Sequence, residues 1–340
     1  MVENKARLPG IDIARVFCAC LVVMIHCVIS DGHPIAHMIV RCFAQQAVPF
    51  YFIVSGFFFR GKLDQCGDRK QAVRGFVKKN LGLYFAWVIL YLPGTLATYN
   101  GLYEDASAIY RLMLILRRIF FAGEGVCWYL LVLAESAVIA GLLMDRKSIL
   151  YGMAIIGLVL GWIFEWDASW AFFGKINQIT YMLFSWSNNV VMKGLPYFAA
   201  GIFLAERKTL FRAERKWLAV GYLAVSLVQV ISFGLICSKD ASLERFMSTY
   251  SIQAVLLFLI CAQPTQREIP AKWCTVLRDI SSTIYFTHTF FIYDLVDQIL
   301  GNGASTFVRF AVPVGLGVAV YVLAKGLKIK PLCWLFLIKT

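Results

Sequence analysis

The sequence is poor in charged residues: Asp, Glu, Lys and Arg make up only 16% of its 340 residues. Soluble domains carry about 25% charged and about 45–50% apolar residues, whereas 60% of this chain is hydrophobic. The mean hydropathy is correspondingly high, at +0.70. Because too few polar side chains are present to cover a water-exposed surface, a soluble enzyme is excluded. The composition predicts an integral membrane protein in contact with the lipid bilayer.

Acidic residues and paired cysteines are also scarce. The chain has 20 Asp and Glu against 33 Lys and Arg, a net charge of +13. In membrane proteins such an excess gathers in cytoplasmic loops and fixes orientation, so we expect no nucleic-acid partner. No two of the ten cysteines form a C-x-x-C pair, and His33 and His37 have no third ligand nearby in the sequence. We therefore expect no metal site and no bound cofactor.

Apolar runs of membrane-spanning length, about 20 residues, recur along the chain. We expect ten spanning helices, at roughly 11–30, 36–59, 81–99, 126–144, 149–166, 179–205, 217–237, 248–263, 276–300 and 305–324. With the N-terminus inside, most Lys and Arg fall in cytoplasmic segments, which favours an even number of spans and two cytoplasmic termini. The expected fold is an all-α, polytopic transmembrane helical bundle, with one domain over residues 1–340.

The first expected span carries three ionisable residues, which are costly inside a membrane and by default mark function. Arg15 and His26 are eleven residues apart, almost three helical turns, so they share one face about 16 Å apart. Asp12 precedes Arg15 by one turn and is placed to pair with it. Two interpretations remain open here. The three form a structural ion pair and a hydrogen-bonded core histidine, or they form a functional face with a neutral imidazole as general base.

Five short motifs follow one another along the chain: Leu8–Arg15 with His26, Val48–Gly56, Phe76–Lys79, Cys127–Leu130 and Ile280–His288. The first is an Arg, ten intervening residues and a His. The second contains Pro-Phe-Tyr-Phe and Ser-Gly, and the last has the order Ser, Tyr, His. This ordered set resembles membrane acyltransferase family three, the integral membrane O-acyltransferases.

The resemblance implies transfer of an acyl group, usually acetyl, from cytoplasmic acyl-coenzyme A as co-substrate. The acceptor would be a hydroxyl of a cell-envelope glycan or lipid-linked sugar, and the location the bacterial cytoplasmic membrane. We expect His26 to act as general base, Arg15 to hold the thioester end of the donor or the developing oxyanion, and Asp12 to hold Arg15 in place. The other expected site residues are Tyr285, His288 and Ser55 as supporting groups, Arg74, Lys78 and Lys79 as acyl-coenzyme A ligands, and Arg41, Trp128 and Glu135 as cavity-lining residues.

Several of these positions have structural alternatives that the sequence leaves open. Coenzyme A is polyanionic and suits a basic loop, but Lys and Arg there also serve orientation alone. Ser55 precedes Gly56, and small residues in a span are commonly packing sites. His288 has an equally good interpretation as a hydrogen-bonded core histidine. The oligomeric state, including a homo-oligomer, is also open.

A transporter is the main alternative function. Lys193 to Pro196 interrupts the sixth expected span, and broken helices with charged residues near the midplane are typical of transporters. The chain is also similar to the membrane half of serine-racemase-type vancomycin-resistance proteins, whose membrane domain is thought to bring in serine. The sequence ends at Thr340 without a racemase domain, which favours a free-standing acyltransferase. A non-catalytic scaffold for glycan assembly is a third option, and it would not need the Arg–His face.

Overall fold

The computed structural model describes residues 8–27, 34–123, 125–165, 188–237, 249–264, 269–301 and 304–338, and all regular structure within them is helical. The longer helices are α1 (Pro9–Cys27), α3 (Ala47–Cys66), α4 (Arg69–Leu102), α6 (Trp128–Leu143), α7 (Lys147–Glu165), α10 (Arg215–Cys237), α12 (Ala271–Thr289) and α14 (Thr306–Leu327). The shorter ones are α2 (Pro34–Cys42), α5 (Ala108–Arg117), α9 (Leu195–Glu206), α11 (Tyr250–Ala262), α13 (Asp297–Leu300) and α15 (Lys330–Leu335), and π-helical turns occupy Arg118–Ala122, Val190–Gly194 and Phe290–Val296. The expected all-α class is confirmed.

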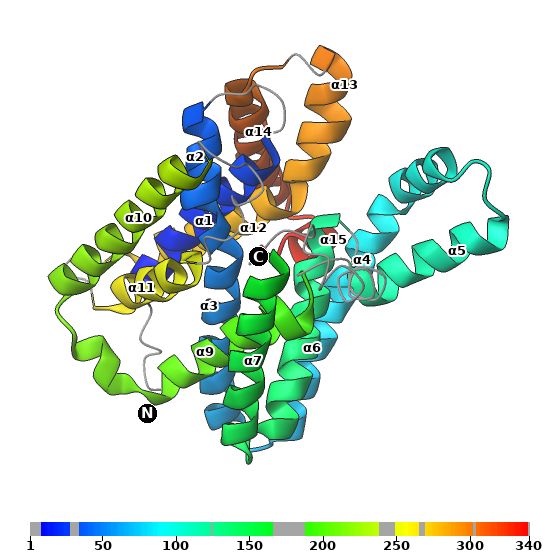
Figure 1. Ribbon diagram of the computed structural model, residues 1–340. Coiled ribbons are helices and arrows are strands. Elements are labelled where there is room, and N and C mark those ends of the chain that lie inside the picture. Colours follow the sequence, from blue (N-terminus) through cyan, green and yellow to red (C-terminus); the bar gives the residue numbers. More distant parts are fainter. Residues whose placement is uncertain are drawn as a thin grey trace. The chain divides into compact units, whose positions relative to one another are not determined.

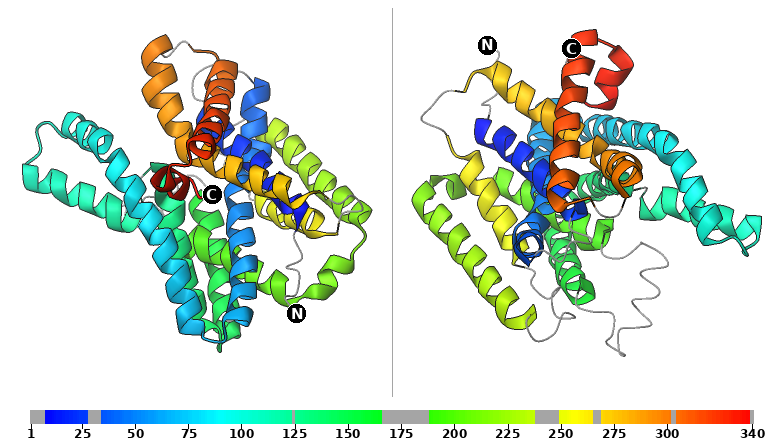
Figure 2. Two further views of the ribbon diagram at one scale, coloured as in Figure 1. Left: turned by 180° about the vertical axis from the view of Figure 1, so that it is seen from behind. Right: turned by 90° about the horizontal axis from the view of Figure 1, so that it is seen from above.

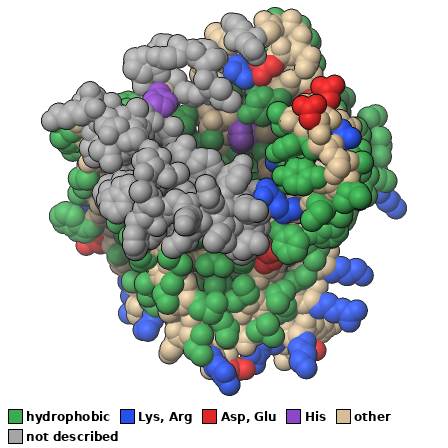
Figure 3. Space-filling model, turned by 45° about the vertical axis from the view of Figure 1, so that its right-hand side comes forward, with side chains coloured by type: hydrophobic (Ala, Val, Ile, Leu, Met, Phe, Trp, Pro, Cys, Tyr) green, Lys and Arg blue, Asp and Glu red, His purple; other side chains and the backbone are tan. Residues whose placement is uncertain are grey.

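Six helical stretches are long and apolar enough to cross a membrane: Pro9–Cys27, His37–Cys66, Arg69–Leu102, Gly125–Leu143, Arg215–Leu235 and Thr306–Leu327. Many large apolar side chains point outward from such helices, including Ile89, Leu142 and Leu223, which are 68%, 75% and 66% exposed. Hydrophobic side chains cover much of the described surface in Figure 3. This is the surface expected of a multi-pass membrane protein, whose outer side chains meet lipid rather than water.

The remaining expected spans differ from a full-length apolar helix for separate reasons. At 1.5 Å per residue, the 13 residues of α11 extend about 20 Å, short of the roughly 30 Å hydrocarbon core. The 19-residue α12 carries Lys272, Arg278 and Asp279, which makes it too polar to stand among the six. The expected span 179–205 lies outside the described residues as far as 187, and the π-helical turn Val190–Gly194 precedes its helix α9. Ten spans and two cytoplasmic termini stay predictions.

The contacts divide the chain into two units: Met1–Val54 with Arg207–Thr340, called unit 1, and Ser55–Glu206, called unit 2. In unit 1, α1 packs against α12, α11 and α14, and α10 packs against α11 (Figure 1). Figure 2 shows α1, α12 and α14 as neighbours from two further directions. Their core is a cluster of buried side chains: Ala19, Val23 and Cys27 of α1 with Ile284 and Ile292. In unit 2, α4 packs against α6, and α7 against α9. The expectation of a single domain stays a prediction.

Two glycines allow helices to approach closely, one in each unit. A Cβ added at Gly10 of α1 would collide with the backbone carbonyl oxygen of Cys261 in α11, and one added at Gly56 of α3 with that of Phe198 in α9. Small residues at helix contacts are the usual means of close packing in membranes. The Ser55–Gly56 pair therefore has a packing role in unit 2, whatever else the serine does.

Gly56→Ala should lower the stability of unit 2, because the new methyl group has to displace backbone rather than a flexible side chain. Overpacking of this kind costs about 1–3 kcal/mol. The thermal unfolding midpoint of the purified protein in detergent measures the effect. Gly61→Ala in the same helix is the matched control, since nothing lies within 4 Å of its added Cβ, and it should leave the midpoint unchanged or raise it. Equal midpoints for the two variants would contradict the close contact.

Candidate functional site

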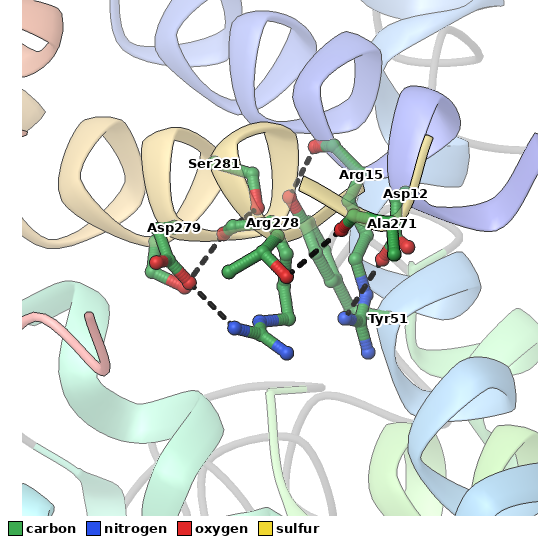
Figure 4. Close-up of polar contacts among 9 residues, drawn as sticks. Asp12, Arg15, Tyr51, Ala271, Arg278, Asp279 and Ser281 are labelled. Atoms are coloured by element: carbon green, nitrogen blue, oxygen red, sulfur yellow. Dashed lines mark hydrogen bonds and ion pairs between the residues drawn. The ribbon is translucent and has the colours of Figure 1, made fainter. Parts of the chain in front are cut away.

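The expected site residues of unit 1 lie along the contact between α1 and α12. Arg15 of α1 and Arg278 of α12 extend toward the same side at one end (Figure 4), and the ring centroids of His26 and His288 are 5.1 Å apart at the other. Arg15 and His26 are separated by eleven residues, and Arg278 and His288 by ten. The two helices therefore run parallel and in register, with paired cations at one end and paired imidazoles at the other.

Each arginine at the charged end has a carboxylate partner on its own helix. Arg15 Nη1 is 3.5 Å from Asp12 Oδ1, and Arg278 Nη2 is 2.7 Å from Asp279 Oδ1. The side chain of Asp279 is fully buried, while those of Arg15 and Arg278 are 21% and 27% exposed. Figure 4 shows both guanidinium groups extended toward the same side. The hydroxyl of Tyr51 donates to the Arg15 carbonyl at 2.6 Å, which ties α3 to this turn of α1.

The hydroxyl groups of α12 explain how so polar a helix can pack against its neighbours. The side chains of Ser281 and Ser282 donate to the carbonyl of Arg278 at 2.7 and 3.2 Å, and Thr287 donates to that of Thr283 at 2.7 Å. Such back-bonding satisfies each hydroxyl within its own helix. The helix α12 can therefore pass through the core of unit 1, although its sequence is polar for a buried helix.

The imidazole end contains His26, His288 and a tyrosine. His288 is fully buried, and its Nδ1 donates to the Tyr285 carbonyl at 2.7 Å. That bond fixes the tautomer with the lone pair on Nε2, an atom with no hydrogen-bond partner among the described residues. His26 is half-buried, and its Nδ1 lies 3.3 Å from the hydroxyl of Tyr293. When His26 carries its hydrogen on Nδ1, it donates to this phenol oxygen and keeps a lone pair on Nε2.

A buried ion pair supports the same end of unit 1. Arg309 Nη2 of α14 is 2.6 Å from Asp297 Oδ2 of α13, and their side chains are only 6% and 15% exposed. The Cys27 thiol donates to the carbonyl of Arg309 at 3.0 Å, which joins α14 to the last residue of α1. Breaking a buried pair typically costs about 3–5 kcal/mol, so this contact holds α1, α13 and α14 together next to His26.

The arrangement separates two chemical capacities along α1. Two guanidinium groups suit an anion such as a phosphate, for which Arg offers bidentate hydrogen bonds. Two neutral imidazoles suit proton transfer. Arg15 and His26 are about 16 Å apart along the helix axis. A ligand that contacts both groups has to extend over this distance.

Other expected site residues lie in unit 2. The Ser55 and Tyr129 hydroxyl oxygens are 2.9 Å apart. Trp128 begins α6, and Glu135 is half-buried in it. The expected acyl-coenzyme A ligands Arg74, Lys78 and Lys79 are all exposed on α4.

Two expected positions in unit 1 remain partly outside the described structure. The side chain of Arg41 is not among the described ones, and neither is His33. The ring of His37 packs on Phe233 with centroids 5.7 Å apart, so this histidine has an aromatic partner on α10.

Three basic residues of unit 2 form ion pairs with carboxylates on neighbouring elements. Glu206 Oε1 is 2.8 Å from Arg60 Nε and 2.7 Å from Lys147 Nζ. Arg69 forms two hydrogen bonds with Asp145, at 2.7 and 2.9 Å. These bonds lower the pKa of Asp145. Arg60 and Arg69 therefore help to hold α3 and α4 against their neighbours in unit 2.

Three residues at the α1–α12 contact escaped the sequence interpretation: Arg278, Tyr293 and Arg309. Arg278 and Arg309 fall inside the expected spans 276–300 and 305–324, although neither is among the expected site residues. Their position inside a span was the available signal, because an intramembrane charge marks function or a buried pair. Tyr293 carried no signal, since a tyrosine in an apolar run is ordinary.

Comparison with known proteins identifies the family. Two amino-acid racemases of Enterococcus faecalis are 25% and 27% identical over 288 and 273 residues, or 81% and 76% of this chain. A serine/alanine racemase of Enterococcus gallinarum is 32% identical over 108 residues, 29% of this chain. The chain spans only 36% of the length of the first two racemases and 14% of the third. No solved structure matches it. A family model described as an acyltransferase domain matches residues 8–324, and the chain therefore belongs to this acyltransferase family.

Proposed function

We propose that this chain is an integral membrane acyltransferase that moves an acyl group, acetyl in the simplest case, from acyl-coenzyme A to a hydroxyl. The acceptor is a cell-envelope glycan or a lipid-linked sugar, and the membrane is the bacterial cytoplasmic membrane, with both termini in the cytoplasm. The observation that carries the proposal is the placement of paired guanidinium groups and paired imidazoles at the two ends of one helix face. Family membership supplies the reaction class.

The spacing of the two ends fits the donor. The arm of coenzyme A between its nearest phosphate and its sulfur contains about thirteen bonds, as long as a little over four extended residues, or about 15 Å. Arg15 and His26 are about 16 Å apart on α1. A donor whose phosphate lies at Arg15 therefore places its thioester near His26. Arg15 then binds the anionic end of the donor instead of the oxyanion, and Asp12 holds its guanidinium in position.

The reaction is a single acyl transfer in this proposal. His26 takes the proton from the acceptor hydroxyl as its oxygen attacks the thioester carbonyl carbon, so that a C–O bond forms and the C–S bond breaks. The proton then passes from His26 to the leaving sulfur, which gives the O-acyl product and coenzyme A with a free thiol. His288 faces His26 and offers its Nε2 lone pair as a second acceptor for hydrogen bonds from the reacting groups.

The exposed basic residues of α4 suit an anionic ligand. Arg74, Lys78 and Lys79 all project from the first three turns of this helix. Arg binds phosphate in bidentate fashion and Lys as a point charge. We assign them to phosphate groups of acyl-coenzyme A, and we assign no chemical step to Ser55, Trp128, Glu135 or Arg41.

Amino-acid transport is the second candidate, because curated relatives are named amino-acid racemases. A membrane part that brings an amino acid to a racemase would bind that amino acid and have no thioester turnover. Purified protein in nanodiscs with radiolabelled acetyl-coenzyme A separates the two. Loss of thioester and transfer of label support the acyltransferase. Uptake of labelled serine into proteoliposomes, with no donor turnover by the folded wild type, supports the transporter.

His26→Ala should abolish transfer, because general-base catalysis is typically worth about 10²–10⁴-fold. The measurement is the rate of label transfer from acetyl-coenzyme A, at a protein level equal to wild type. His37→Ala removes a histidine that packs on Phe233 in the same unit and should keep wild-type activity. Full activity of the His26 variant would remove this residue from the mechanism.

Tyr293→Phe should slow transfer without changing the donor KM, because it keeps the ring against His26 and removes only the hydroxyl whose hydrogen bond at Nδ1 holds the imidazole in position. A lost hydrogen bond of about 0.5–1.5 kcal/mol corresponds to a decrease of about 2- to 12-fold in kcat. Tyr222→Phe is the matched control, since it removes a phenol hydroxyl that accepts from Gln46 Nε2 at 2.8 Å. It should lower the unfolding midpoint and spare kcat. An unchanged kcat in the Tyr293 variant would show that His26 does not depend on this bond.

A further inference from the structure

We propose that Arg278 is a second donor-binding residue, which forms with Arg15 a two-guanidinium site for the phosphate closest to the pantetheine arm of acyl-coenzyme A. The inference rests on the proposed function and deepens it, since it names the part of the donor that unit 1 recognises. Arg278 lies outside the motif of α1, and it enters the site only because α1 and α12 pair in register.

The surroundings of Arg278 favour binding of an anion over a purely structural ion pair. Its carboxylate partner Asp279 is fully buried, whereas the arginine side chain is 27% exposed. A ligand that approaches this turn of α12 therefore meets the guanidinium and not the carboxylate. The bond of 2.7 Å from Nη2 to Asp279 holds the guanidinium in position, and the side chain extends away from α12 (Figure 4).

The neighbouring arginine strengthens the argument. Arg15 and Arg278 extend their guanidinium groups toward the same side from two different helices (Figure 4), and they stand at corresponding positions of the paired α1 and α12. Like charges repel, and they do so more strongly where the dielectric constant is low. An anion bound by both groups attracts each of them and offsets this repulsion, and a phosphate offers oxygens to both. Two neighbouring helices that each contribute one arginine thus form a single phosphate site.

The position of this site along the helices also fits. Arg278 is ten residues before His288, as Arg15 is eleven before His26, so both guanidinium groups lie about 15–16 Å from the imidazole pair. A phosphate held by both is at the correct distance for the pantetheine arm described above. The same pair would be too far from the imidazoles to serve an acetyl group directly.

Two small donors isolate the one phosphate in question: S-acetyl-4′-phosphopantetheine and S-acetyl-pantetheine, which differ only in that group. Wild type should use the phosphorylated donor with the lower KM. Arg278→Gln should raise the KM for the phosphorylated donor by about 10- to 100-fold, as expected for hydrogen bonds to a charged group. It should leave the KM for S-acetyl-pantetheine and the kcat for both donors close to wild type.

Control variants keep the test decisive if a buried Asp279 without its partner prevents folding. Arg278→Lys keeps the charge and should retain part of the preference for the phosphorylated donor. The double variant Arg278→Gln/Asp279→Asn removes both charges and should lose the preference while remaining folded. Arg212→Gln, an exposed arginine of unit 1, should behave as wild type.

The outcomes separate two failures. If wild type uses the phosphorylated donor well and the Gln and double variants retain its preference, Arg278 does not bind phosphate and the inference is overturned. An equal KM increase for both donors overturns it as well, because the effect would then be structural. If folded wild type turns over neither these donors nor acetyl-coenzyme A, the proposed function fails first.

Discussion

The parallel packing of α1 on α12 is the constraint on which the candidate site depends. Small side chains on α1, among them Ala19 and Cys27, allow close contact with Ile284 and Ile292. Because α1 and α12 are parallel and begin and end at corresponding positions, arginines of both helices lie at one end and histidines of both helices at the other. A shift by one turn would separate the imidazoles and the arginines together, so the core packing and the chemistry are specified by the same interface.

Polar groups in this core are satisfied locally, which is the condition for their burial away from water. Each arginine of the pair has an acid within its own helix, and the serines and threonines of α12 donate to carbonyls one turn back. Polar contacts between helices are then of two kinds: ties such as Tyr51 to the Arg15 carbonyl, and the bond between His26 and Tyr293 at the imidazole end.

The sequence was sufficient for the helical class and for the face that carries Asp12, Arg15 and His26, because both follow from composition and a period of 3.6 residues. It did not predict the partner of that face, since α12 lies more than 250 residues away and local patterns carry no information about such contacts. The hydropathy of the sequence also gives no reason to expect Arg278 at a contact between helices. Its place in a packed helix depends on the buried Asp279 and the back-bonded hydroxyls, which a residue-by-residue scale does not register.

The π-helical turns between Phe290 and Val296 follow directly on α12. A π-helical turn accommodates one residue more than an α-helical turn and is frequent at functional sites. The extra residue rotates everything that follows it about the helix axis, which here includes the side chain of Tyr293. Removing one residue from this segment would return it to α-helical geometry and turn the phenol by about 100°, away from His26. Insertions or deletions in this segment would therefore rotate Tyr293 relative to His26 and leave the packing of α12 intact.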